Sequence, residues 1–363
     1  FMQVCLCGKE QAMFQQAENL FFQNSCIDFS ANVNFLEVPE PVMQAARMGL
    51  VAAMQDVQES EGTLEEHVAE WEGVQPEHVF CGNGAAEVTR SLTMVLKPKK
   101  ALLPAPGFEE YIRTLKISQC SVTYYYTKES DGFRIPLEDF CGQITEDIDL
   151  VFLSNPNNPT AALYDRAFIE AVLKQCEAVH AMLILDEVYL DFIEQADELT
   201  MSSDHMSRSL FIVKDFTRMF AMSGVRLGYG LCADNELLEQ MNKSLLPLYR
   251  ASAVAQKAGI ACTKESEFMQ KTVQETTKER EWLLGEFKKL GIEGTGTGNI
   301  IFFKTRPRLH VFSIVNGIML RDCSNLEGMP EGYYRVAVKS HEENEKLIEM
   351  LRQWQNQFHS HEQ

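Results

Sequence analysis

The sequence contains no apolar run near the ~18 residues that a membrane-spanning helix needs, no internal repeat and no low-complexity tract. Its first residues, FMQVCLCGKE, lack a basic segment followed by a longer apolar stretch, so we expect no signal peptide. Positive charge is scarce as well: 33 Lys and Arg face 52 Asp and Glu, which gives a net charge of −19. A surface this acidic repels phosphate backbones and anionic lipid headgroups, so we expect neither nucleic acid nor a membrane as a partner.

The ten cysteines are scattered along the 363 residues and do not resemble the dense framework of a small secreted domain. Cys5 and Cys7 form a Cys-x-Cys pair, but no second ligand pair follows at the spacing of a zinc site. We therefore expect reduced thiols, no metal site and a cytoplasmic protein.

Short runs that are apolar on both faces alternate with helical patterns through the first 250 residues. Such runs are typical of strands in a covered, mostly parallel sheet. The runs are 79–81, 101–103, 150–153, 182–185 and 210–213, and the helical segments are 85–96, 108–116, 164–178 and 234–246. This pattern predicts a large α/β domain with helices on both faces of the sheet.

The pattern changes after about residue 250. A long helical stretch over 253–290 is followed by apolar runs at 300–303 and 334–338 and by a final helix over 341–357. The glycine cluster at 294–298 precedes a strand, so we interpret it as a loop. We expect an N-terminal arm (1–40), a large cofactor-binding α/β domain (41–248) and a small α+β domain (249–363).

Three segments directly after predicted strands are candidates for a site. In GNGAAE (82–87), glycines allow close approach of a ligand and the following helix offers free N–H groups, although a plain strand-to-helix turn has the same features. In NPNNPT (155–160), two prolines fix a turn among asparagines. Asp186 and Tyr189 follow a buried strand, where α/β sheets bind ligands, although a capping role for Asp186 is equally compatible.

Taken in order, these blocks resemble the fold-type I enzymes that use pyridoxal 5'-phosphate (PLP). The resemblance is to the histidinol-phosphate aminotransferase and threonine-phosphate decarboxylase branch and spans about residues 28–350. The blocks that carry it are DFSANVN (28–34), GNGAAE (82–87), PAPGFEEY (104–111), NPNNPT (155–160), DEVYLDF (186–192), FTRMFAMSGVRLGYG (216–230), LRDCSN (320–325) and YYRVAV (333–338). It implies an amino-acid-like substrate and a homodimer.

The resemblance also implies roles for single residues. Asp186 would pair with the pyridinium nitrogen of PLP, and Tyr189 with Asn158 would bind its phenolic oxygen. The remaining cofactor contacts would come from Gly84, Ala85, Ala86, Phe108, Asp215 and Arg226. Asn34, Arg321 and Arg335 would bind substrate, Arg335 clamping its carboxylate.

The sequence departs from the family at the centre of that site. Arg218 stands at the position of the Schiff-base lysine, and a guanidinium offers no free amine. Asp215 replaces a serine that donates to the phosphate in the family. Its carboxylate would repel the phosphate unless pairing with Arg218 offsets its charge. Asp56 stands where the neighbouring subunit contributes a tyrosine. Lys214 is a poor substitute for the Schiff-base lysine. Because side chains alternate along a strand, that of Lys214 would not point at the PLP ring.

Two interpretations remain open. The first is a PLP-dependent aminotransferase or decarboxylase whose catalysis is impaired and whose cofactor is held without a covalent bond. The second is a non-catalytic pseudoenzyme of the same fold that binds another ligand or partner. An engineered lysine-to-arginine change would explain Arg218, but it would explain neither Asp215 nor Asp56.

Overall fold

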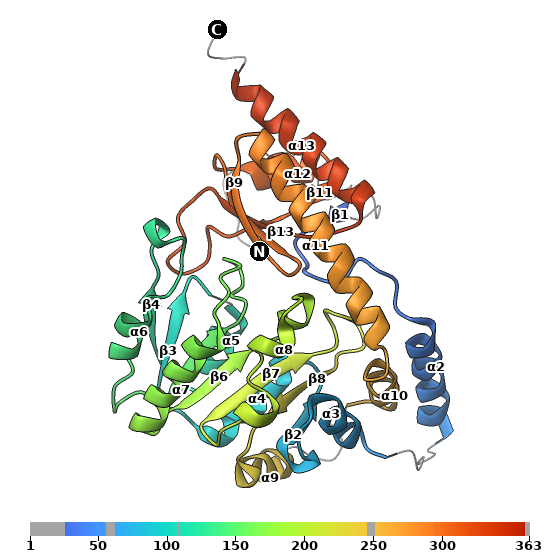
Figure 1. Cartoon of the computed structure of the whole chain (residues 1–363), viewed down its shortest axis with the longest axis vertical. Coiled ribbons are helices and arrows are strands. Elements are labelled where there is room, and N and C mark those ends of the chain that lie inside the picture. Colours follow the sequence, from blue (N-terminus) through green and yellow to red (C-terminus); the bar gives the residue numbers. More distant parts are fainter. Residues whose placement is uncertain (1–25, 56–61, 108, 245–250, 360–363) are drawn as a thin grey trace.

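The computed structural model describes residues 26–55, 62–107, 109–244 and 251–359. A seven-stranded sheet with the order β2–β8–β7–β6–β5–β3–β4 lies at the centre of the larger part (Figure 1). Its strands are β2 (Val79–Gly82), β3 (Lys100–Ala105), β4 (Ser121–Tyr126), β5 (Leu150–Ser154), β6 (Met182–Asp186), β7 (Leu210–Asp215) and β8 (Gly228–Leu231). All neighbouring strands are parallel except β8, which is antiparallel to both of its neighbours. The predicted α/β fold is confirmed.

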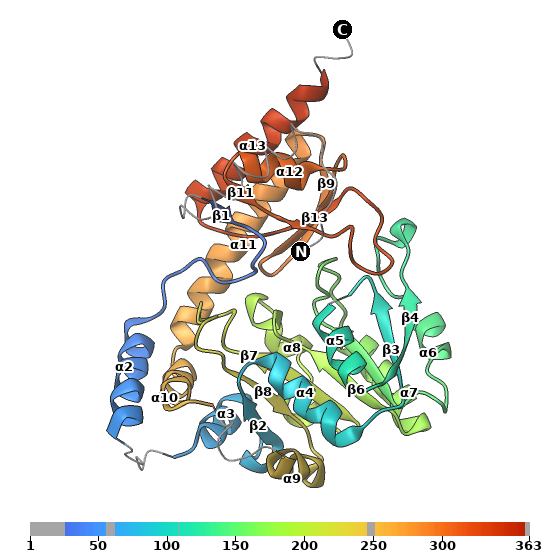
Figure 2. The same cartoon turned by 180° about the vertical axis from the view of Figure 1, so that it is seen from behind.

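Helices lie on both faces of this sheet: α7 is in front in Figure 1, and α4 is in front in the view from behind (Figure 2). They are α2 (Glu40–Gln55), α3 (Leu64–Glu72), α4 (Ala85–Leu96), α5 (Glu109–Ile117), α6 (Leu137–Gly142), α7 (Arg166–Val179), α8 (Ala196–Leu199), α9 (Asn235–Ser244) and α10 (Ala253–Cys262). Short 3-10 turns are η1 (Pro76–His78), η2 (Glu129–Asp131), η3 (Leu190–Phe192) and η4 (Ser203–His205). Because helices cover the sheet, β5 and β7 are buried along almost their whole length.

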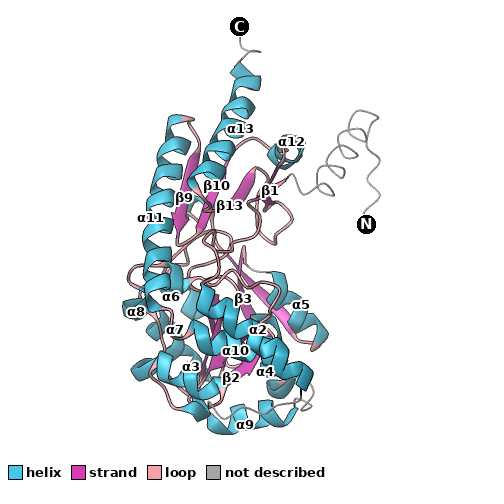
Figure 3. Ribbon diagram, turned by 90° about the vertical axis from the view of Figure 1, so that its right-hand side faces the viewer, coloured by secondary structure: helices cyan, strands magenta, loops and turns pink. Residues whose placement is uncertain are grey.

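A second core forms around a four-stranded antiparallel sheet with the order β12–β13–β10–β9. Its strands are β9 (Glu293–Thr297), β10 (Ile300–Lys304), β12 (Arg321–Asp322) and β13 (Tyr333–Ala337), and β1 (Ile27–Asp28) pairs in parallel with β11 (Ile318–Met319). The helices are α11 (Ser266–Lys289), α12 (Leu309–Val315) and α13 (His341–His359). Figure 3 shows α11 extending from the larger part to this sheet.

Two sequence-based expectations are wrong in detail. The glycine cluster at 294–298 is not a loop: its first residues form the edge strand β9, paired antiparallel with β10. Glycine leaves room for neighbouring side chains there, because a Cβ on Gly294 would lie 3.2 Å from Phe303 and one on Gly296 would lie 3.1 Å from Arg280. The helical stretch 253–290 is two helices, α10 and α11, separated at residues 263–265.

Candidate functional site

Polar side chains at the carboxyl ends of β5, β6 and β7 surround a cavity of about 110 Å³ that the N-terminus of α4 also lines. Ligands of open α/β sheets bind at this end of the strands. Eleven residues line the cavity: Ala85, Ala86, Glu110, Tyr111, Asn158, Asp186, Val188, Tyr189, Asp215, Arg218 and Arg226. All but Glu110, Tyr111 and Val188 are candidates from the sequence, so the fold gathers most of the candidate residues in one place.

The first turn of α4 is built to receive an anion. No side chain caps this helix, so its first N–H groups are left for a ligand. Gly84, the N-cap residue, has a φ of +89°, and a Cβ there would lie 2.7 Å from Nη2 of Arg226. Glycine at this position therefore allows the Arg226 guanidinium to approach the helix terminus.

Asp186 is buried at the end of β6 and is held by donors of the protein. The Tyr111 hydroxyl donates to Oδ2, the Val188 N–H donates to Oδ1 at 2.9 Å, and the Ser154 hydroxyl lies 3.4 Å from Oδ2. Burial nevertheless raises the pKa of Asp186 to about 6. Above that pH the carboxylate is charged and can pair with a protonated ring nitrogen. Tyr111 was not among the site residues predicted from the sequence. Its place in the PAPGFEEY block could have indicated that it belongs to the site.

Asp215 lies on the cavity at the end of β7 and is 8% exposed. The Thr217 hydroxyl donates to its Oδ2 at 2.6 Å, and the backbone N–H of Arg218 donates to Oδ1 at 3.2 Å. Burial raises the pKa of Asp215, and the Thr217 hydrogen bond opposes that rise. The expected ion pair is not formed: no contact between the Arg218 guanidinium and Asp215 falls within ion-pair distance in the described structure.

Arg218 directs its guanidinium to the ring of Tyr189, with Cζ 5.9 Å from the ring centroid. Its Nε is buried without a hydrogen-bond partner, and none of the described residues forms an ion pair with it. The pKa of Arg218 is raised, mainly by the charge of a deprotonated Tyr189 and against the effect of burial. The guanidinium therefore stays protonated and supplies no amine to the cavity.

Arg335, on β13, joins the second sheet to the cavity. Its Nη1 donates to Oδ1 of Asn158 at 2.5 Å, and its Nη2 donates to the carbonyl of Ser30. Both partners are neutral, and the buried Nε has no partner in the described structure. Arg321 is the cross-strand neighbour of Arg335 and has a long contact of 3.8 Å with Glu109. Neither Arg335 nor Arg321 is among the residues that line the cavity.

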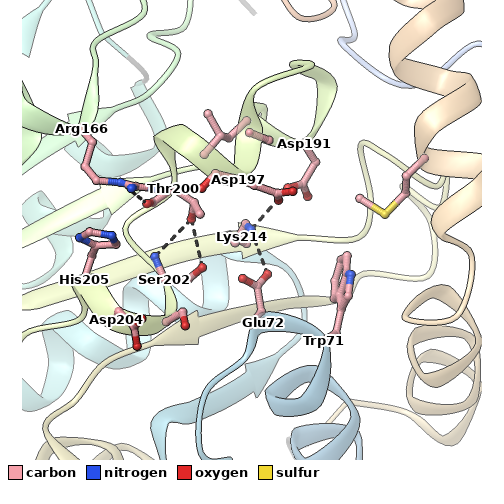
Figure 4. Close-up of a pocket in the computed structure, with 14 residues that line it drawn as sticks. Trp71, Glu72, Arg166, Asp191, Asp197, Thr200, Ser202, Asp204, His205 and Lys214 are labelled. Atoms are coloured by element: carbon pink, nitrogen blue, oxygen red, sulfur yellow. Dashed lines mark hydrogen bonds and ion pairs between the residues drawn. The ribbon is translucent and has the colours of Figure 1, made fainter.

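Lys214 faces away from this cavity, as strand alternation predicts. It lines a separate pocket of about 410 Å³, where Figure 4 shows its Nζ between Glu72 and Asp191. The Nζ lies 2.9 Å from Glu72 Oε1 and 3.4 Å from Asp191 Oδ1, and the side chain is 7% exposed. Lys214 is thus fixed in a buried ion-pair network and does not replace the missing lysine.

The side chain of Asn34 is engaged within the protein and does not line the cavity. Its Nδ2 donates to the carbonyl of Met219 at 2.7 Å and to Thr272 Oγ1 at 2.9 Å, and its Oδ1 accepts from the Leu36 N–H. Both Nδ2 protons of Asn34 are therefore engaged by the protein, which does not favour a role in substrate binding. Phe108 and Asp56 lie outside the described residues.

Across the described ranges, no group of three or more His, Cys, Asp or Glu side chains is placed to hold a metal ion. The same residues include no helix that is both long and apolar enough to cross a bilayer.

Known proteins resemble this chain over most of its length. The model of a family described as aminotransferase class I and II matches residues 24–351. Threonine-phosphate decarboxylase of Salmonella typhimurium is 29% identical over 332 residues, which cover 90% of each chain. Histidinol-phosphate aminotransferase of Methanothermobacter thermautotrophicus is 27% identical over 345 residues, covering 91% of this chain and 89% of that protein.

Solved structures share the fold. The histidinol-phosphate aminotransferase of Clostridium acetobutylicum superposes with a TM-score of 0.81 at 24% identity, covering 91% of this chain and 99% of that one. The aspartate aminotransferase of Thermotoga maritima gives a TM-score of 0.80 at 20% identity, covering 97% of this chain and 98% of that one. By its sequence along nearly its whole length, the chain belongs to the class I and II aminotransferase family, whose members depend on PLP.

Proposed function

We propose that this protein binds PLP reversibly, without covalent attachment, and that its aminotransferase or decarboxylase chemistry is impaired. The observation that carries the proposal is Arg218: a protonated guanidinium lines the cavity where the family has its Schiff-base lysine. The nearby amine of Lys214 is buried and is held by Glu72 and Asp191 at another pocket. Neither side chain offers a free amine to a carbonyl carbon.

Most of the cavity suits PLP. The N-terminus of α4 and Arg226 fit a phosphate, Asp186 fits a pyridinium nitrogen, and Asn158 with Tyr189 fits a phenolic oxygen. When bound, PLP supplies an electron sink for bonds at the α-carbon of an amino acid. Arg335, which donates to Asn158 at the cavity, would hold the substrate carboxylate. Among the described residues, no lysine lines the cavity to move the α-proton.

Asp215 is the residue that fits the cofactor least. Its carboxylate lines the same cavity as the α4 terminus and Arg226, where the phosphate would lie. Two like charges ~4 Å apart repel by about 1 to 4 kcal/mol, depending on the local dielectric. We therefore expect weaker binding of the phosphate than in relatives with a hydroxyl at this position.

The substrate class follows from the relatives, which are named for decarboxylation of a phosphorylated threonine and for transamination of histidinol phosphate. We propose an amino acid or an amino-acid phosphate. The residues that line the cavity do not distinguish decarboxylation from amino transfer.

The second candidate function is that of a non-catalytic pseudoenzyme that binds a different ligand or partner. Asp215 favours it, because a carboxylate in the phosphate cup suits a neutral or cationic group better than a phosphate.

Equilibrium dialysis of the wild-type protein with PLP, followed by borohydride reduction and intact mass measurement, tests the proposal. We expect saturable binding that dialysis reverses and an unmodified mass after reduction. Saturable binding without turnover of an amino acid supports impaired catalysis. A reduced, PLP-modified protein would contradict the proposal, and absence of binding would favour the pseudoenzyme.

PLP binding should depend on the ionisation of Asp186. Because burial raises the pKa of Asp186 to about 6, its carboxylate becomes neutral as the pH falls below that value and loses the pyridinium partner. Affinity for PLP should therefore rise as the pH increases through about 6. Tyr111→Phe removes a hydrogen bond that lowers this pKa, so the midpoint should move to higher pH.

Dialysis at a series of pH values measures this midpoint. Tyr126→Phe is the matched control, since it deletes an exposed hydroxyl that bonds to Glu327. A Tyr111→Phe midpoint equal to that of the control would show that Tyr111 does not tune Asp186.

We further propose that the protein is cytoplasmic and that its domains are divided after residues 40 and 248, as predicted from the sequence.

We also propose that the protein is a homodimer. The outer face of α2 supports an interface, because Met48, Leu50, Val51 and Met54 are between 52% and 79% exposed there. Light scattering at micromolar concentration should give twice the mass of the chain. Met54→Glu with Val51→Glu should shift the protein toward monomer, and a wild-type monomer would refute the dimer.

A further inference from the structure

We propose that the pocket around Lys214 binds a small organic ammonium ion, an amine that carries an apolar or aromatic group. Asp191 pairs with the ammonium of this ligand, and Trp71 covers its apolar group. The pocket has a volume of about 410 Å³, within the range of small-molecule sites, and shares no lining residue with the cavity described above. The inference therefore goes beyond the proposed function and does not depend on it.

The buried wall of this pocket is short of positive charge. Lys214 is one ammonium between two carboxylates, those of Glu72 and Asp191, and the three side chains are only 6% to 10% exposed. Glu72 has the shorter contact with Lys214, at 2.9 Å, and also accepts from the Tyr229 hydroxyl at 2.5 Å. One cation for two carboxylates leaves a buried negative charge without compensation, which costs free energy unless a cation from outside supplies it.

Asp191 is the carboxylate that has capacity left for a ligand. Its contact with Lys214 is long, with Nζ 3.4 Å from Oδ1, and no other described residue donates to it. By contrast, Asp186 and Asp215 in the other cavity each accept from at least two protein donors. A carboxylate has about four acceptor positions, so Asp191 can accept hydrogen bonds from an ammonium in the pocket.

Trp71 gives the pocket an aromatic wall next to these acids. It precedes Glu72 at the end of α3, and Figure 4 shows its ring beside Glu72 and Lys214. The indole stacks on Phe216, with ring centroids 5.5 Å apart and an interplanar angle of 24°, which fixes its orientation. An indole attracts a cation to its face and packs against apolar groups. An indole beside an underpaired carboxylate therefore suits an organic ammonium better than a metal ion or an anion.

The other charged residues of the pocket also favour a cation. Four carboxylates line it against two permanently charged bases, Lys214 and Arg166. Asp197 and Asp204 are exposed, and their carboxylates have no partner among the described residues. Arg166 donates to the carbonyls of residues 197 and 200 and lies at the opposite end of the pocket from Trp71 (Figure 4). The local potential therefore attracts cations and repels anions.

Calorimetric titration of the whole chain, dialysed free of PLP so that no amine condenses with the cofactor, tests the proposal. The probe is 2-phenylethylamine, compared with 2-phenylethanol, which has the same skeleton without the charge, and with the anion 3-phenylpropionate. Wild type should bind the amine at least about tenfold more tightly than the alcohol, because a hydrogen bond between charged groups is lost with the alcohol. The anion should bind most weakly.

Variants assign the binding to this pocket. Asp191→Asn should weaken the amine about tenfold or more and leave the alcohol unaffected, and Trp71→Leu should weaken the amine about threefold or more. Asp197→Asn with Asp204→Asn should weaken it about twofold to fivefold. The last two residues are exposed, so this double variant keeps the test open if Asp191→Asn does not fold, as judged by circular dichroism and the urea midpoint.

Two variants serve as controls and should bind the amine like wild type. Asp215→Asn makes the same change in the other cavity, and Asp147→Asn makes it at a surface residue that is 60% exposed and pairs with Lys100. Absence of amine binding to wild type, equal binding of the alcohol, or an unchanged affinity in folded Asp191→Asn would overturn the proposal. So would a loss in Asp215→Asn without one in Asp191→Asn, because it would place the amine in the other cavity.

Discussion

The double variant Arg218→Lys with Asp215→Ser is expected to attach PLP covalently, whereas wild type is expected to bind it only reversibly. The lysine restores an amine on the cavity, beside the ring of Tyr189, where the guanidinium now lies. The serine removes a charge from the cavity that the N-terminus of α4 and Arg226 line, and it supplies a hydroxyl there. Borohydride reduction followed by intact mass measurement should give a modified protein for the double variant and an unmodified one for wild type.

The single variants separate the two effects. Removing a like charge worth about 1 to 4 kcal/mol should tighten reversible PLP binding by roughly fivefold to nearly a thousandfold in Asp215→Ser. Asp215→Asn, which keeps the shape and can still accept from Thr217, should show most of this gain if charge is the cause. Arg218→Lys alone should attach PLP, but at higher PLP concentrations. A double variant that binds no PLP would show that the cavity has lost its cofactor altogether.

Lys214→Met is expected to destabilise the fold by about 3 to 5 kcal/mol, the usual cost of removing one partner from a buried ion pair. Lys214 is the ammonium between Glu72 and Asp191, and the carboxyl of Glu187 is also close enough to influence it. Without Lys214 these acids would remain buried with no cation. The urea midpoint of unfolding should fall accordingly.

The pH dependence gives this prediction a second readout. Burial already raises the pKa of Glu187 to about 7 and raises the pKa of Asp191 as well. Because protonation of these acids removes the uncompensated charge, the deficit of Lys214→Met should shrink as the pH falls below about 7.

Lys243→Met, an exposed residue paired with Glu239 at 2.6 Å, is the control and should cost no more than ~0.5 kcal/mol. A loss below ~1 kcal/mol for Lys214→Met would contradict a structural role for Lys214.

Five strands of the large sheet were predictable because burial leaves continuous apolar runs such as Leu150–Leu153. Strands β4 and β8 were not predicted. Strand β4 is an edge strand with no buried residue, and the Gly-Tyr-Gly-Leu sequence of β8 is short and has no such run. Strand β9 is rich in glycine for a tertiary reason, the close approach of Arg280 and Phe303, and sequence propensity alone reads it as a loop.

In the site, residues directly after strands were found because strand ends gather at one edge of a parallel sheet. Asn34 and Asn32 show what the sequence could not resolve. Both belong to the same block, yet Asn34 is used by Met219 and Thr272, while Asn32 has no side-chain partner among the described residues. The unpaired state of Arg218 was equally hidden, because it depends on where its side chain meets Tyr189 and not on its neighbours in sequence.

Visible absorbance titration with PLP, run in parallel on wild type and on Arg218→Lys with Asp215→Ser, tests most directly whether Arg218 has replaced covalent attachment. Wild type should keep the absorption of unattached PLP at every concentration, and the double variant should develop the band of the covalently attached cofactor. If wild type itself develops that band, another amine reaches the cofactor and the account of Arg218 is wrong.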